Sequence, residues 1–487
     1  MSATKGSTVH AANDEEHGAP GDRGSIIALM ISLLVAVFAF QLNASMLSPA
    51  LVTMQRELNT TASDISMTQT VFFTAAALFS LFLPRLADLA GRKKVLLGML
   101  LATVVGCVIS ALSVNIPMLL IGRVLQGVSG PLVPLCLIML HVRVPDNARY
   151  ARLMAVITSV NGGIAGIDAL LGGWLAANHG FRSIFWTMAG IAAVAMVLVW
   201  ITTEESYAEE QSKMDWLGVV LIVVAIGSLL VAVDEAKKLG DANWLLFAIL
   251  LVVAIVAFVA FWNVEKRKKA PMVATHYLKQ RRTWGLLLTT LLTMTGVFAI
   301  MNGIVPAIAQ DTKFGAGLGA DLASLATLTP YAIAGLAFGP IAGWLASRFG
   351  YHTVLRSGLI ASIIGIGLIM LTATAPHVWL LVCVSVFVGL AYAGTVNIML
   401  NGLGIVLSPD DNPGYLPGLN AGAFNLGAGL SFAVLYAVMT QINGGTGTAS
   451  YVISVAVGGV LVVAALLCSF LIPKVEESSA AGEVSAA

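Results

Sequence analysis

Residues 84–96 read PRLADLAGRKKVL, and residues 343–355 read GWLASRFGYHTVL. Both segments begin with a small or turn-forming residue and continue with an apolar residue, Ala and a polar residue. A Gly then precedes the closing Val-Leu by four residues in each segment. Each segment joins the second and third long apolar runs of its half of the chain. Two loops that share a pattern at matching positions indicate a duplicated helical bundle.

The chain around these loops has the composition of an integral membrane protein. Of its 487 residues, 58% are hydrophobic and 10% are charged, and the mean hydropathy is +0.90. Soluble domains carry about 25% charged residues, so a soluble globular protein is excluded. Residues 1–24 are polar and of mixed charge. We therefore expect no cleavable signal peptide and an insertion signal in the first apolar run.

Fourteen apolar runs are long enough to cross a bilayer, which takes about 20 predominantly apolar residues. They predict an all-α membrane protein with fourteen transmembrane helices, arranged as two pseudo-symmetric six-helix bundles and an inserted helix pair. Duplicated halves with a substrate site between them are typical of secondary transporters. The predicted parts are an N-terminal tail (1–24), an N-terminal bundle (25–202), the inserted pair with its linkers (203–283), a C-terminal bundle (284–473) and a C-terminal tail (474–487).

The distribution of basic residues predicts the orientation of the chain. An even number of spans places both termini on one side of the membrane. Of the 26 Lys and Arg residues, twenty lie on the side of the termini, five lie on the opposite side, and Arg123 lies within a span. Cytoplasmic loops carry the excess of basic residues. We therefore expect both termini in the cytoplasm and the protein in the inner (plasma) membrane of a bacterium.

Residues 84–96 resemble the loop signature of the major facilitator superfamily, Gly-x-Leu-Ala-Asp-x-x-Gly-Arg-Lys, with Pro84 in place of the first Gly. Residues 121–131, IGRVLQGVSGP, resemble the Arg-x-x-Gln-Gly signature of the same family. The inserted pair resembles that of its fourteen-span drug:proton antiporters. The resemblance implies transport by alternating access and a cytoplasmic gating motif formed by Asp88, Gly91, Arg92 and Lys93.

The predicted fifth span, 151–177, contains the acidic residue Asp168. A charge at the centre of a bilayer helix costs roughly 2.5–3.5 kcal/mol on insertion scales. Antiporters of the family carry Gly-Pro-x-x-Gly-Gly here, whereas this chain has Asp168 and Ala169 in place of the first Gly and the Pro. The family pattern also places an Asp in span 1, where this chain has Asn43. The resemblance therefore implies that the proton-carrying acid has moved from span 1 to Asp168.

Arg123 is the one basic residue deep in a span. At 1.5 Å of rise per residue, Arg123 is expected about 9 Å and Asp168 about 15 Å from the outer ends of their helices. We expect the two side chains to interact directly, or through Gln126, Asn161 or water, which would offset the cost of burial. Asp168 would then load a proton outside and release it inside. The alternative is a permanently ionised pair that only fixes helix packing.

Polar side chains within spans mark candidates for the substrate pathway. Any one Asn in a span commonly forms an interhelical hydrogen bond, but together these residues predict an uncharged, hydrogen-bonding cavity. The candidates are Gln41, Asn43, Gln126, Asn161, Asn302, Tyr331, Asn397, Asn401 and Asn425.

These features predict a secondary active transporter that exports a small amphiphilic or polar molecule by proton antiport. The alternative is a metabolite symporter or facilitator, which the missing Pro and the missing span-1 acid favour. The sequence has no metal-ligand spacing, phosphate-binding loop or nucleophile triad. We expect no enzymatic activity, cofactor, metal or nucleic-acid partner, and a monomer whose partners are its substrate, protons and lipid.

Overall fold

The computed structural model describes most of the chain as long α-helices. The described part of the first half consists of α-helices and one short 3-10 helix. They are α1 (Pro20–Ser45), η1 (Ser48–Ala50), α2 (Leu51–Glu57), α3 (Ala62–Ala90), α4 (Arg92–Ala111), α5 (Ile116–Gly127), α6 (Leu132–Arg143), α8 (Ala165–His179) and α9 (Phe181–Thr202). The described residues are 20–144, 146, 149–150, 153–154, 156–157, 165–207, 214–236, 242–268, 275–409, 415–445 and 447–473.

The remainder of the described chain contains the inserted pair and a second set of long helices. Two of its segments, η3 and η4, are π-helical. The elements are α10 (Trp216–Ala236), α11 (Trp244–Arg267), α12 (Thr275–Leu278), α13 (Arg281–Ala299), η3 (Ile300–Ile304), α14 (Val305–Gln310), α15 (Ala320–Ala326), α16 (Leu328–Phe349), α17 (Tyr351–Thr374), α18 (Val378–Val388), η4 (Gly389–Val396), α19 (Asn397–Val406), α20 (Tyr415–Gln441), η5 (Asn443–Gly445), α21 (Thr448–Cys468) and η6 (Ser469–Leu471).

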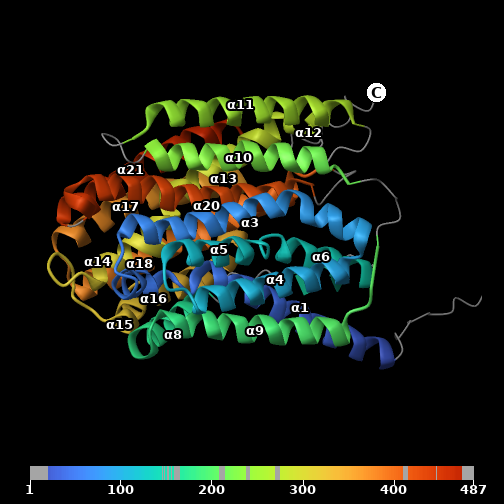
Figure 1. The fold of residues 1–487 in the computed structure, drawn as a ribbon, viewed down its shortest axis with the longest axis horizontal. Coiled ribbons are helices and arrows are strands. Elements are labelled where there is room, and N and C mark those ends of the chain that lie inside the picture. The colour runs from blue at the N-terminus through green and yellow to red at the C-terminus, as the bar shows by residue number, and fades with distance from the viewer. Residues whose placement is uncertain are drawn as a thin grey trace, which may run out of the picture.

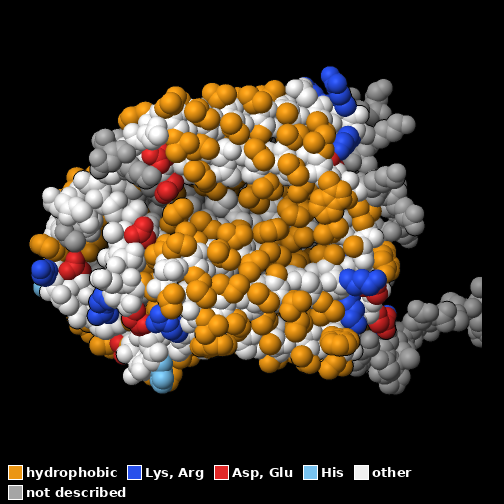
Figure 2. All heavy atoms as spheres, in the orientation of Figure 1, with side chains coloured by type: hydrophobic (Ala, Val, Ile, Leu, Met, Phe, Trp, Pro, Cys, Tyr) orange, Lys and Arg blue, Asp and Glu red, His pale blue; other side chains and the backbone are white. Residues whose placement is uncertain are grey.

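The surface agrees with a membrane location. Thirteen helical segments of the described chain are long and apolar enough to cross a bilayer. Figure 2 shows apolar side chains over the middle of the molecule and charged side chains gathered towards the helix ends. The prediction of an all-α membrane protein is therefore confirmed. The predicted span 151–177 lies partly outside the described residues, so the count of fourteen, the pseudo-symmetry and the part boundaries stay predictions.

The two sets of helices meet along two seams. Along one, α3 packs lengthwise against α20 (Figure 1). Along the other, α8 packs against α15 and α16. Glycine permits the close approach at the second seam, because a Cβ on Gly173 would lie 2.6 Å from the Ala320 carbonyl oxygen. A Cβ on Gly166 would lie 2.7 Å from the Ala332 methyl group.

The inserted pair, α10 and α11, packs mainly on itself and lies along one edge of the molecule (Figure 1). At one end of the pair, Asp215 precedes α10, accepts a hydrogen bond from the Gly218 N–H (2.8 Å) and forms an ion pair with Lys268. Burial alone would raise the pKa of Asp215, but the Lys268 ammonium and the Gly218 N–H together hold that pKa below its ordinary value. These contacts join the beginning of α10 to the end of α11.

Candidate functional site

The site begins where α1 ends. Pro49 has no N–H to donate, so the helix cannot continue through it in regular form. The chain instead ends α1 at Ser45, turns, and resumes as the short 3-10 helix η1 and then α2. A helix end leaves backbone carbonyl groups without their usual donors. In this molecule the Asn43 carbonyl group in the last turn of α1 receives its donor from another helix.

That donor is Arg123 of α5. Its side chain is fully buried, and its two terminal nitrogens lie 3.4 and 3.3 Å from the Asn43 carbonyl oxygen. The same nitrogens donate to the side-chain oxygens of Gln126 (2.6 Å) and Gln69 (2.5 Å). The guanidinium also lies 4.2 Å from the ring centre of Phe72. Arg123 therefore ties α1, α3 and α5 together through uncharged acceptors.

Asp168 of α8 contacts the same turn of α1 and is 1% exposed. The Ser45 hydroxyl donates to its Oδ2, and its Oδ1 has no hydrogen-bond partner among the described residues. The predicted direct contact between Arg123 and Asp168 is wrong: the two residues form no ion pair, and no hydrogen-bond partner among the described residues joins them. Helix rise indicated similar depths, but depth does not say which neighbour a side chain faces. The predicted bridge through Asn161 lies outside the described residues.

The backbone of α8 around Asp168 is held by the second set of helices. The Ser324 hydroxyl of α15 donates to the Ala169 carbonyl oxygen at 3.0 Å. The Thr329 hydroxyl of α16 donates to the Gly166 carbonyl oxygen at 3.3 Å. These two bonds lie on either side of Asp168 in the sequence. The carboxyl group therefore lies on a helix that contacts both α1 and the opposite set of helices.

Two substrate candidates contact serines on either side of the break in α1. The Gln41 amide nitrogen lies 2.9 Å from the Ser45 hydroxyl, one turn before the break. Asn302 lies in the π-helical segment η3, and its side-chain oxygen is 3.4 Å from the Ser48 hydroxyl. Such π-helical turns are frequent at functional sites. Gln41 and Asn302 therefore place hydrogen-bonding groups from the two sets of helices on the two sides of this break.

The other candidates take different positions. Asn43 is buried, and its amide donates to the Ala39 carbonyl oxygen at 2.8 Å, so it supports α1 itself. Gln126 belongs to the Arg123 group and donates to the Ser110 hydroxyl at 2.8 Å. No hydrogen bond joins the last four candidates to Asp168 within the described chain. Asn397 and Asn401 bond to each other at 3.1 Å on α19, Tyr331 is half-buried on α16, and Asn425 is buried on α20.

The predicted gating motif is ordered by an acidic residue that sequence reasoning missed. Arg92 forms an ion pair with Asp88 at 2.8 Å. The Glu205 carboxylate accepts hydrogen bonds from the backbone N–H groups of Lys93 (2.9 Å) and Lys94 (3.3 Å). An anion at the beginning of a helix is stabilised by the unpaired N–H groups there. Glu205 is 112 residues from Lys93 in the chain, so local sequence contained no signal for this contact.

Gly91 makes room for this arrangement. Its φ is +108°, a backbone conformation that favours glycine. A Cβ there would lie 2.7 Å from the Glu205 carboxylate. The loop therefore needs glycine for its conformation and for the space that Glu205 occupies.

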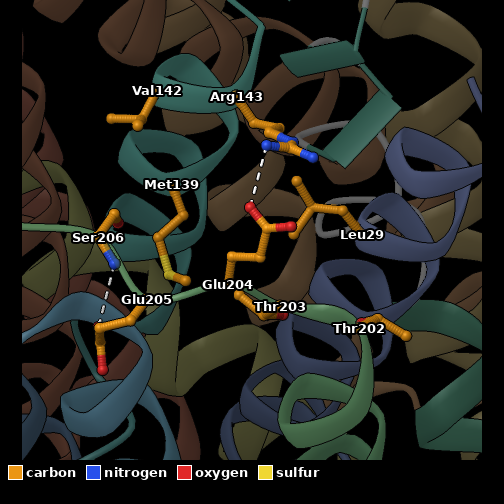
Figure 3. Close-up of a pocket in the computed structure, with 9 residues that line it drawn as sticks. All are labelled: Leu29, Met139, Val142, Arg143, Thr202, Thr203, Glu204, Glu205 and Ser206. Carbon is orange, nitrogen blue, oxygen red and sulfur yellow. Dashed lines mark hydrogen bonds and ion pairs between the residues drawn. The ribbon is translucent and has the colours of Figure 1, made fainter. Parts of the chain in front are cut away.

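A cavity of about 130 Å³ lies beside the same segment, between α1, α6 and the residues after α9. Arg143 and Glu204 pair at its edge with a distance of 3.0 Å, and Glu205 points away from that pair (Figure 3). The cavity contains none of the predicted site residues. It lies beside the loop at residues 84–96.

Comparison with known proteins identifies the family. A sequence model described as the Major Facilitator Superfamily matches residues 33–432 and again residues 286–486. The chain is 64% identical over 456 residues to the uridine/deoxyuridine transporter of Lactococcus lactis subsp. cremoris (strain MG1363), covering 92% of this chain and 95% of that relative. It is 26% identical over 438 residues to the quinolone resistance protein NorB of Staphylococcus aureus (strain MRSA252), covering 86% and 90%.

A solved structure agrees with the fold. A mutant of the nucleoside transporter NupG superposes with a TM-score of 0.61 at 14% identity, covering 90% of this chain and 99% of that one. At this identity the likeness concerns the fold alone. The relatives favour the predicted alternative, a symporter or facilitator, over drug antiport, and the fourteen-span drug:proton branch is not confirmed. The chain belongs to the Major Facilitator Superfamily.

Proposed function

We propose that this protein carries a nucleoside of the uridine type across the membrane by alternating access. The single observation that carries this proposal is its 64% identity, over 92% of the chain, to a uridine/deoxyuridine transporter. The relative described as a quinolone resistance protein is only 26% identical. Substrate export as a drug antiporter is therefore the weaker candidate.

The polar groups at the break in α1 suit such a substrate. A nucleoside of this type is uncharged and presents hydroxyl and carbonyl groups, which amide and hydroxyl side chains can bind. Gln41, Ser48 and Asn302 offer these groups where the two sets of helices meet. Arg123 has its donors occupied by protein acceptors, so recognition of the substrate does not require it.

In this proposal Asp168 couples transport to protons, and the direction is symport into the cell. A buried carboxyl without a basic partner is costly to ionise, so its charge depends on access to water and on substrate. Arg123 acts indirectly, by holding the end of α1 that Asp168 contacts. The Asp88–Arg92 pair and Glu205 hold the cytoplasmic side in its closed arrangement, with both termini in the cytoplasm.

Radiolabelled uridine flux into proteoliposomes tests the proposal. With the outside more acidic than the lumen, symport predicts uridine accumulation above the outside concentration, and a protonophore should abolish it. Equilibration without accumulation would leave a facilitator and remove the coupling role of Asp168. Absence of uridine flux together with proton-driven ethidium transport would contradict the proposed substrate.

A further inference from the structure

The Ser45 hydroxyl has two acceptors and one proton. Its oxygen lies 3.0 Å from the Gln41 carbonyl oxygen and also contacts Asp168 Oδ2. The Gln41 amide donates to the same oxygen at 2.9 Å. Because a hydroxyl carries one hydrogen, Ser45 can donate either to the backbone of α1 or to the carboxylate.

The charge of Asp168 decides between these two arrangements. Ionised Asp168 has no hydrogen to offer, so Ser45 must donate to it, and the Gln41 carbonyl loses that donor. Protonated Asp168 can donate to the Ser45 oxygen, which then donates to the Gln41 carbonyl. One proton is added to Asp168, and every other hydrogen stays on its own heavy atom.

We propose that Ser45 is a positioning residue that transmits the protonation state of Asp168 to the broken end of α1. The inference rests on the proposed role of Asp168 as the coupling acid. Ser45 is the last residue of α1. Three residues later Ser48 contacts Asn302, and the Pro49 carbonyl accepts a hydrogen bond from Gln310 at 3.0 Å. A change at Ser45 therefore lies within one turn of the contacts between the two sets of helices.

Among the described residues, no basic side chain pairs with the Asp168 carboxylate. Residues 26–45 of α1 and all of η1 contain no ionisable side chain. None of the ionisable residues in α9, α15 and α16 forms a hydrogen bond or ion pair with Asp168 in the described structure. They are Arg182, which pairs with Glu57 at 3.2 Å, Asp321, Tyr331 and Arg348.

Replacing the hydroxyl tests the inference in proteoliposomes, with uridine as substrate. A hydrogen bond to an ionised group is about twice as strong as one between neutral groups. Loss of the hydroxyl in Ser45→Ala should therefore destabilise ionised Asp168 more than protonated Asp168. We expect the midpoint of the uptake–pH curve to move upward by about one unit, a roughly tenfold change in proton concentration. Uridine counterflow at equal pH should stay within about twofold of the natural protein. Ser45→Thr keeps the hydroxyl and should restore the midpoint.

Ser32→Ala is the matched control, because Ser32 is buried in α1 and donates to its own helix at Leu29 (2.8 Å). An unchanged or lowered midpoint in Ser45→Ala would overturn the inference. If that variant is not recovered folded, Ser45→Cys, with its weaker donor, must give an upward shift of smaller size. Asp168→Asn separates the two proposals. If the Asp168→Asn protein still takes up uridine in response to a pH gradient, the coupling role itself is contradicted. If Asp168→Asn loses this uptake but Ser45→Ala keeps the natural midpoint, only the role of Ser45 is contradicted.

Discussion

Arg123 and Asp168 are two buried ionisable residues that contact the same turn of α1, but their surroundings differ. Arg123 donates to Asn43, Gln69 and Gln126, so uncharged acceptors surround its charge. Asp168 has one partner, Ser45, and an oxygen with no partner among the described residues. The surroundings of Arg123 stabilise its charged form, whereas those of Asp168 offer little stabilisation to an ionised carboxylate.

This difference separates two roles that sequence alone had combined. A guanidinium does not lose its proton in proteins, so Arg123 can fix a helix end through the whole transport cycle. A carboxyl group can be charged or neutral, and only such a group can carry a proton.

Removing the fixed charge should damage the fold. Arg123→Met leaves the acceptors of Asn43, Gln69 and Gln126 buried without a donor, at about 1–3 kcal/mol each. We expect a loss of about 3–9 kcal/mol in stability, measured as a lower melting temperature and a reduced yield of monodisperse protein. Arg123→Lys keeps the charge but loses the planar fork and should be intermediate. A stable Arg123→Met protein whose uridine uptake depends differently on pH would contradict this assignment, because Arg123 would then act in proton coupling and not in the fold.

Separating α8 from α1 should be the next most severe change. A Cβ on Gly172 would lie 2.1 Å from the Met46 carbonyl oxygen, so Gly172→Ala must push apart the helices that bring Asp168 to Ser45. Overpacking of this kind costs about 1–3 kcal/mol. Thermal unfolding and uridine uptake should both decline. Gly190→Ala is the control, because a Cβ on Gly190 has no atom within 4 Å. Equal effects of the two substitutions would contradict the close approach.

The segment after α9 offers two adjacent acidic residues for a comparison with a smaller expected effect. Glu205→Ala removes both acceptors at the beginning of α4 and should cost about 0.5–2 kcal/mol, as loss of a helix cap does. Glu204→Ala breaks only the exposed pair with Arg143, which is worth about 0–1 kcal/mol. Differential scanning fluorimetry of the two variants measures the difference. A larger loss in Glu204→Ala would contradict the capping role of Glu205.

Asp215 is a carboxyl group with a basic partner, and it should show the smallest effect. Asp215→Asn loses the ion pair with Lys268, at about 0.5–1 kcal/mol near neutral pH. Because the pKa of Asp215 is lower in the folded protein, its contribution is present above about pH 4 and is lost as the pH falls through the folded value. Melting temperatures of the two proteins should converge in acid. A gap that widens in acid would contradict this assignment.

The sequence predicted those features that depend on composition and local pattern. Apolar runs and the loop at 84–96 predicted the membrane fold and the superfamily, and an acid within an apolar run predicted the buried position of Asp168. The sequence did not predict which side chains contact each other between helices. Helical spacing fixes which residues share a face, but it does not say which neighbour that face meets. For that reason Arg123 was paired with the wrong partner, and Glu205 was missed.

A measurement of proton movement tests the central claim most directly. Proteoliposomes with the natural protein are loaded with a pH-sensitive dye. When uridine is added outside, the dye should report acidification of the lumen. With Asp168→Asn, the dye signal should disappear while exchange of labelled for unlabelled uridine continues. Acidification by the Asp168→Asn protein at the natural rate would contradict the account, because the proton would then cross without the carboxyl group proposed to carry it.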